Sequence, residues 1–309
     1  MSSIIKATDI AYVRFSAPDL DRMEAFLKDF GLHVAGRSED TLYMRANGPA
    51  PFCHVTHKGE AGFVGLGFYA ANEGDLKKLA EAEGLAVEAS DAPGGGARVR
   101  LTDLDGFPID VVAGQTPADP LPLPEPLSFN ADDRYPRLGA TKRIAAGPSH
   151  VMRLGHAVLD VTDFRASEAW YKARLGFVTS DEIELAPDAP LGAFLRCDGG
   201  ERYVDHHTLF LVGTGKPGFN HAAWQVANFD DLMAGHSHLE QAGAAHVWGV
   251  GRHILGSQIF DYWRDPWGHK VEHWTDGDLF NNETPPGKAG IDALMGAQWG
   301  PDAPPAMAE

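Results

Sequence analysis

Apolar positions along the chain recur in one order, which predicts a strand, a helix and three more strands, four times over. The four runs span residues 10–59, 63–114, 154–214 and 219–277. Each predicted helix begins near an Asp, Asn or Ser that can cap it, and each apolar strand is followed by a Gly, Pro or Asp turn. Such a repeat constrains the fold more than any single motif does.

One helix and one small sheet cannot cover their own apolar face, so pairs of units should close into half-barrels with the helices outside. We therefore predict an α+β fold of four βαβββ modules paired into two half-barrel domains. Residues 115–126 hold five prolines in twelve positions and indicate an extended connector. The predicted division is a first domain with this connector at 1–126, a second domain at 127–280 and an extended tail at 281–309.

Composition narrows the functional classes. The chain has 309 residues, 44% of them hydrophobic and 22% charged, which is typical of a globular protein. Its formal charge of −17 disfavours binding to nucleic acids or anionic membranes. Two cysteines make no disulfide framework, and we find neither a secretory signal nor a long apolar span. We expect a soluble cytoplasmic protein without nucleic-acid or membrane partners.

Three polar residues on predicted strands of the second domain could share a metal. His156 and His221 lie on the first strands of modules three and four, and Glu272 lies on the last strand of module four. Two neutral imidazoles and one carboxylate form the facial triad of non-haem Fe(II) oxygenases, which leaves positions free for substrate and dioxygen. Because side chains alternate along a strand, His273 should point away from this group.

An inward His on a strand is more often a hydrogen-bonded core residue than a ligand, so the repeat serves as an internal comparison. Aligning the two halves puts Tyr12 at the position of His156 and Gly65 at that of His221. Asp110 stands at the position of Glu272. Since only one of three possible ligands remains, we predict that the first domain holds no metal.

At these residues the chain resembles the type I extradiol ring-cleavage dioxygenases of the vicinal oxygen chelate superfamily, over nearly all of residues 8–280. The resemblance implies Fe(II), with Mn(II) as an alternative, bound by His156, His221 and Glu272. It also implies that the substrates are an aromatic diol of the catechol type and O2, in the catabolism of aromatic compounds. The ring would open beside the diol to a semialdehyde-type product, and the family habit suggests a homo-oligomer.

Three further positions match the family's pattern. His207 resembles its acid–base histidine, which would take a proton from the catechol and return it later in the reaction. His253 and Tyr262 resemble residues that hydrogen-bond the reacting oxygens, although Tyr262 also lies in an aromatic cluster and could be a packing residue. His206 should face away from His207 on a strand, with a structural or solvent-facing role.

The fold alone leaves other functions open, because glyoxalase-like metal-dependent isomerases, other metal enzymes and non-catalytic small-molecule binders use the same paired modules. An isomerase of this type needs a fourth protein ligand on the closing strand of module three, where only Asp205 could serve. We expect the substrate pocket to be lined by Trp248, Ile254, Phe260 and residues of the tail.

Overall fold

The first half of the chain contains two copies of the predicted unit. The computed structural model describes residues 3–125 and 128–307. The first unit consists of β1 (Ala7–Ala17), α1 (Leu20–Asp29), β2 (His33–Arg37), β3 (Thr41–Arg45) and β4 (His54–Lys58). The second unit consists of β5 (Gly62–Ala70), α2 (Glu73–Glu83), β6 (Glu88–Ala89), β7 (Ala97–Thr102) and β8 (Pro108–Ala113).

The second half repeats the arrangement and adds one short strand. Its first unit consists of β9 (Val151–Val161), α3 (Phe164–Leu175), β10 (Val178–Ala186), β11 (Ala189–Arg196), β12 (Val204–Asp205) and β13 (Leu209–Gly213). Its second unit consists of β14 (Gly218–Val226), α4 (Phe229–Gln241), β15 (Ala245–His253), β16 (Ile259–Arg264) and β17 (Lys270–Thr275). The prediction of four βαβββ modules is confirmed.

Helix boundaries follow from capping residues that repeat with the modules. Asp19 and Asp163 cap α1 and α3, and Asn72 and Asn228 cap α2 and α4, each accepting hydrogen bonds from backbone N–H groups of the first turn. The same cap type therefore returns after two modules. This is the pattern expected if a pair of modules, rather than a single module, was duplicated.

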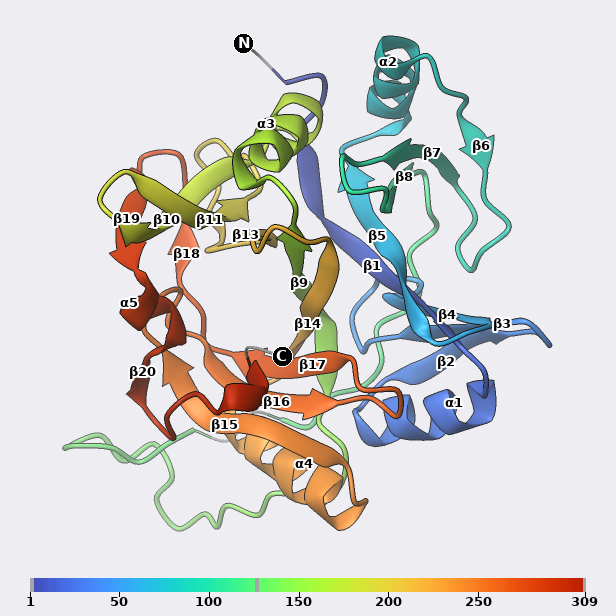
Figure 1. Ribbon diagram of the computed structural model, residues 1–309. Helices are drawn as coiled ribbons and strands as arrows, with labels where there is room; N and C mark the ends of the chain where they lie inside the picture. The colour runs from blue at the N-terminus through green and yellow to red at the C-terminus, as the bar shows by residue number, and fades with distance from the viewer. Residues whose placement is uncertain (1–2, 126–127, 308–309) are drawn as a thin grey trace.

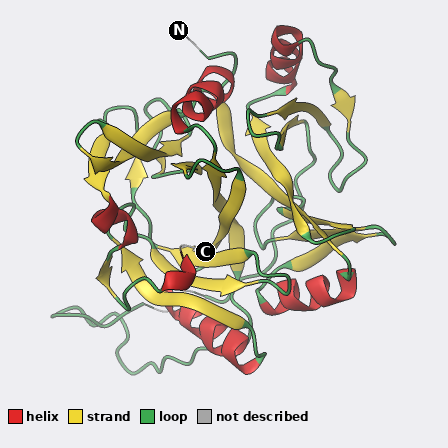
Figure 2. Ribbon diagram, viewed as in Figure 1, coloured by secondary structure: helices red, strands yellow, loops and turns green. Residues whose placement is uncertain are grey.

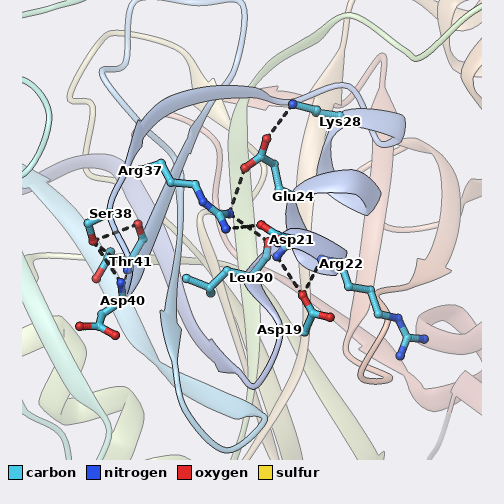
Figure 3. Close-up of polar contacts among 10 residues, drawn as sticks. All are labelled: Asp19, Leu20, Asp21, Arg22, Glu24, Lys28, Arg37, Ser38, Asp40 and Thr41. Carbon is cyan, nitrogen blue, oxygen red and sulfur yellow. Dashed lines mark hydrogen bonds and ion pairs between the residues drawn. The ribbon is translucent and has the colours of Figure 1, made fainter.

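An ion-pair network fastens α1 to the strand that follows it (Figure 3). Asp19 Oδ1 accepts from the backbone N–H groups of Asp21 and Arg22, both at 3.0 Å. Arg37, the last residue of β2, donates to Glu24 at 3.0 Å and also to Asp21. Because these charges lie on the surface, the network orients the helix more than it stabilises it.

Two curved sheets carry the modules, with the helices on their outer sides (Figures 1 and 2). Within the described residues, the first sheet has the order β2-β3-β4-β1-β5-β8-β7-β6. In the second sheet the equivalent strands follow the order β10-β11-β13-β9-β14-β17-β16-β15. In both sheets the first strands of the paired modules are antiparallel neighbours, and each is parallel to the closing strand of its own module. Equivalent side chains therefore face a shared axis.

Strand register supports the alignment of the two halves. Tyr12 pairs with Gly67, which pairs with Asp110, just as His156 pairs with Ala223, which pairs with Glu272. In the first half, Asp110 receives a hydrogen bond from Tyr12 at 3.0 Å. Its carboxylate also pairs with Arg100 at 2.7 Å and Arg14 at 3.5 Å. Guanidinium groups thus neutralise the carboxylate that corresponds to Glu272.

We expect Asp110→Asn to lower the free energy of unfolding by about 3–5 kcal/mol, because it would leave the buried Arg14 guanidinium without its counter-charge. Denaturant unfolding of the variant and the parent measures this difference. Metal content should stay unchanged, since Asp110 belongs to the other half. A loss below about 1 kcal/mol would contradict the idea that this ion pair organises the first half-barrel.

The segment after Gly277 differs from the extended tail that we predicted. It contains β18 (Leu279–Phe280), β19 (Gly287–Gly290), α5 (Ile291–Met295), β20 (Ala297–Trp299) and η1 (Pro305–Met307). β19 pairs with β10 and β20 pairs with β15, so the tail adds a strand to each edge of the second sheet. Unpaired backbone groups at those edges supply the partners that the local pattern of the tail does not reveal.

The connector between the halves lacks long elements, as its prolines predict. Residues 114–125 and 128–150 contain only one isolated bridge, between Ala131 and Arg134. The predicted boundary between positions 126 and 127 lies outside the described residues, as do positions 308–309 of the tail. Among the described helices, none combines the length and apolar character needed to cross a membrane.

Candidate metal centre and active site

Three neighbouring strands of the second sheet bring His156, His221 and Glu272 together. They lie on β9, β14 and β17, where His156 and Glu272 both pair with Ala223 from opposite sides. Glu272 Oε2 lies 3.4 Å from the Nε2 atoms of both histidines. The three residues therefore converge as the sequence predicted.

The Glu272 carboxylate has no protein hydrogen bond that would compensate its burial. The side chain is fully buried, and neither of its oxygens has a hydrogen-bond partner among the described residues. An unpaired buried carboxylate is strongly unfavourable, so a cation bound between Glu272 and the two imidazoles would supply what it lacks. Burial also lowers the pKa of His221 well below its usual value, which favours the neutral form that can ligate a metal. The donor set thus fits a divalent metal.

A neighbouring amide orients one of the candidate ligands. Asn220 Oδ1 lies 2.9 Å from His221 Nδ1, so it accepts the proton of that nitrogen and leaves Nε2 free to face Glu272. Asn220 Nδ2 in turn donates to Asp160 at 3.4 Å. Partners of this kind fix the tautomer and the ring plane of a metal-binding histidine.

His207 lies against the triad and is tied to a buried relay. Its ring centroid is 4.0 Å from that of His156. Its Nδ1 lies 3.0 Å from Nδ1 of His206, and Nε2 of His206 lies 2.7 Å from Asp181. The expectation that His206 faces away was wrong, because the two residues lie in a bend between β12 and β13, where strand alternation does not apply.

This relay determines which nitrogen of His207 is available. An ionised Asp181 only accepts hydrogen bonds, so His206 donates to it through Nε2 and accepts through Nδ1. His207 then donates through Nδ1, and its Nε2 keeps an unprotonated lone pair. Burial, followed by the neighbouring imidazoles, lowers the pKa of His207 well below its usual range. The His207 ring is therefore neutral, and its Nε2 can accept a proton.

His253 and Tyr262 form a second polar pair beside Glu272. His253 Nε2 lies 3.0 Å from the Tyr262 hydroxyl and 3.9 Å from Glu272 Oε1. Burial lowers the pKa of His253 to about 3. Burial and then the charge of Glu272 raise the pKa of Tyr262, which keeps its hydroxyl protonated. Both groups can therefore hold hydrogen bonds to an oxygen bound near the triad.

A cavity of about 300 Å³ is lined by His156, His221, His207, His253 and Tyr262, and its volume lies at the lower end of the range of small-molecule sites. Trp248 lines it as predicted, and the tail contributes Ile291, Leu294, Met295 and Met307. The prediction was wrong for Ile254 and Phe260. Ile254 is exposed, whereas Phe260 is buried behind His253, with the two rings stacked at 4.0 Å.

Two other sequence candidates lie elsewhere. His273 points away from the triad, as predicted, and its Nε2–H donates to the carbonyl of Phe30 in the other half at 2.8 Å. Asp205 pairs with Arg153 at 2.6 Å and does not join the triad. The fourth protein ligand that an isomerase would need is therefore not supplied by Asp205.

Comparisons with known proteins agree with this geometry. Residues 153–273 match the Glyoxalase/Bleomycin resistance protein/Dioxygenase superfamily. The chain is 30% identical over 304 residues to metapyrocatechase 2 of Cupriavidus necator, a match that covers 96% of this chain and 89% of the relative. The chain belongs to the extradiol ring-cleavage dioxygenases of the vicinal oxygen chelate superfamily.

Solved structures add the fold of this dioxygenase. Homoprotocatechuate 2,3-dioxygenase of Arthrobacter globiformis superimposes with a TM-score of 0.79 at 21% identity, covering 100% of this chain and 92% of that one. The Mn(II)-bound glyoxalase of Novosphingobium aromaticivorans gives a TM-score of 0.78 at 23% identity, covering 98% and 94%. At such identities these likenesses show the fold alone. Membership of the dioxygenase family implies a catalytic metal, an aromatic diol and O2.

Sequence reasoning missed several residues of the candidate site. Asn220 directly precedes the predicted ligand His221 in the sequence, but strand alternation gives no reason to expect a contact between their side chains. Asp181 lies 25 positions from His206, and no local pattern links them. Contacts of the tail with the cavity were expected without their residues being identifiable.

Proposed function

We propose that this dioxygenase binds Fe(II) through His156, His221 and Glu272 and opens the ring of a catechol beside its two hydroxyl groups. The observation that carries the proposal is the Glu272 carboxylate, which is fully buried without a hydrogen bond and faces two imidazole nitrogens at 3.4 Å. Bound iron would hold both substrates together and allow electron density to pass from the diol to dioxygen. His207, His253 and Tyr262 are the proposed catalytic residues around it.

His207 is proposed as the general base and later the general acid. Its Nε2 is the unprotonated nitrogen of the Asp181–His206–His207 relay, and its side chain lines the cavity. It can accept a proton from a substrate hydroxyl and return it when a leaving oxygen needs one. The relay keeps the ring in the orientation that this exchange requires.

His253 and Tyr262 are proposed to hold the reacting oxygens. Tyr262 is buried and His253 is partly buried, and they contact each other at 3.0 Å, so their positions are set before a substrate arrives. Donors fixed in a water-poor site stabilise negative charge that grows during a reaction more effectively than water does.

The two halves of the chain have different proposed roles. The first, residues 1–126, would support the fold without binding metal, since arginines occupy the space around Asp110. The second, residues 127–280, would carry catalysis. The tail, residues 281–309, would complete the wall of its cavity.

The walls of the cavity favour an uncharged, apolar ring substituent. Most of the lining is apolar, with Val158, Phe194, Phe210, Leu255, Leu294 and Met295 among its residues. Among the described residues, no Lys or Arg lines it, whereas Asp160 does. A substrate carboxylate would find no Lys or Arg in this lining and would share the cavity with the acidic Asp160. We therefore propose an alkyl- or aryl-substituted catechol as substrate.

We expect 3-methylcatechol and biphenyl-2,3-diol to be cleaved with kcat/KM at least about 100-fold above that of homoprotocatechuate. Burying the carboxylate of homoprotocatechuate without a cation is unfavourable, and each cost of about 1.36 kcal/mol lowers kcat/KM tenfold, so two such steps give about 100-fold. Dioxygen uptake and the absorbance of the ring-opened product measure the rates. Asp160→Asn should narrow the difference by favouring the carboxylated substrate. Preference of the parent enzyme for homoprotocatechuate would contradict the proposed substrate class.

A further inference from the structure

We propose that the protein binds a second divalent metal ion on the opposite face of the strand that carries Tyr262, through His236, His246 and Asp261. The nearest atoms of this group are already close together. Asp261 Oδ1 lies 2.9 Å from His246 Nε2, and Asp261 Oδ2 lies 3.1 Å from His236 Nδ1. One donor atom of each residue lies within 4.8 Å of the others.

The elements hold these donors independently of the cavity. Asp261 precedes Tyr262 on β16, so its side chain points to the other face of the sheet, where it contacts His236. His236 comes from α4 and His246 from β15. Three different elements therefore place two imidazole nitrogens and one carboxylate close together.

In the other half of the chain, the equivalent space between helix and sheet contains no such group among the described residues. Counted from the capping residues, His236 corresponds to Ala80, and counted from the strand register, Asp261 corresponds to Val99. Ala80 and Val99 are buried apolar residues that fill the space between helix and sheet. The fold therefore does not require a charged group here. The buried Asp261 carboxylate is compensated by hydrogen bonds from His236, His246 and Trp263. A bound metal would replace the protons that the carboxylate now shares with the two imidazoles.

Outer contacts orient the donors as they do in metal sites. The Trp263 indole N–H donates to Asp261 Oδ2 at 2.7 Å. Glu240 Oε1 lies 3.6 Å from Nε2 of His236, the nitrogen on the far side of the ring from Asp261. This contact is electrostatic and is too long for a hydrogen bond. Nδ1 now donates to Asp261, and it becomes a ligand once a metal replaces its proton.

Geometry and ligand type favour Zn²⁺ or a similar ion. Ligand atoms on a tetrahedral zinc at about 2.0–2.1 Å are about 3.3–3.5 Å apart. Asp261 Oδ1 lies 3.2 Å from His236 Nδ1 and 2.9 Å from His246 Nε2, so these two separations need to widen by only a few tenths of an ångström. The ligand atoms of all three residues lie within 4.8 Å of one another. The His246 side chain is 32% exposed, so an ion can enter from solvent and keep a water as its fourth ligand. Two imidazoles and one carboxylate suit zinc or cobalt better than calcium or magnesium.

The test uses the full-length enzyme, loaded anaerobically with Fe(II) and then equilibrated with Zn²⁺ before unbound metal is removed. Elemental analysis should find about one zinc per chain in addition to the iron. His246→Gln and His236→Gln should lose the zinc and keep the iron. Zinc should raise the Tm of the parent but not of His246→Gln.

Two further variants separate this site from the proposed active site. His238→Gln is the matched control, because His238 lies on the same helix but pairs with Asp29 in the other half. It should bind zinc like the parent. Glu272→Gln should lose iron while it retains zinc, whatever the identity of the active-site metal. The proposal is overturned if zinc enters only by displacing iron, or if both His246→Gln and His236→Gln bind zinc like the parent.

Discussion

Glu272→Gln is expected to abolish both metal retention and ring cleavage. The substitution keeps the size of the side chain but removes the negative charge that faces the two imidazoles at 3.4 Å. Divalent metals in such sites depend on that charge, and a neutral amide would also place an N–H group among the donors. Elemental analysis of anaerobically purified protein should fall from about one iron per chain to a small fraction of that.

The same measurement on His156→Ala should give the same loss, since it removes a second ligand. Asp205→Asn is the matched control, because Asp205 is a largely buried carboxylate that pairs with Arg153 outside the triad. It should keep its iron. A full metal complement in Glu272→Gln or His156→Ala would refute the ligand assignment, and manganese in place of iron would correct the metal alone. Loss of metal in Asp205→Asn would revive a four-ligand, isomerase-like centre.

The repeated module was predictable because it depends on short-range patterns. Apolar alternation, a capping Asp or Asn and a following turn define each strand and helix locally, and these signals recur in all four modules. The strands β19 and β20 were not predictable in this way. They exist because the edges of the second sheet offer them partners, which is a property of the assembled sheet.

The triad was predictable for a related reason. Equivalent positions on equivalent strands must face one axis, so the sequence alone pairs His156 with His221, and strand alternation distinguishes Glu272 from His273. The relay from Asp181 through His206 to His207 escaped prediction. It depends on a bend after the two-residue strand β12, where neither the strand nor the helix periodicity of side chains applies.

His207→Phe should retain its iron and cleave catechols about 10²- to 10⁴-fold more slowly, the contribution typical of a general acid–base group. A phenyl ring fits the place of the imidazole, because His207 already packs edge-on against Phe194 at 4.8 Å. The lost function is the unprotonated Nε2 that the relay presents to the cavity. Steady-state dioxygen uptake, corrected for iron content, measures the difference.

The relay predicts a graded result that a merely structural role for His207 would not produce. Asp181→Asn leaves the cavity intact, but its amide can donate a hydrogen bond to Nε2 of His206. His206 can then donate through Nδ1 to Nδ1 of His207, which places the proton of His207 on its Nε2. The kcat of this variant should therefore fall by less than that of His207→Phe, and its pH–rate profile should shift, while KM for the catechol changes little. Unchanged turnover in His207→Phe would refute the acid–base role. If His207→Phe is slow and Asp181→Asn behaves like the parent, His207 keeps its acid–base role but the relay does not contribute to it. Nε2 of His207 would then be unprotonated without the help of Asp181.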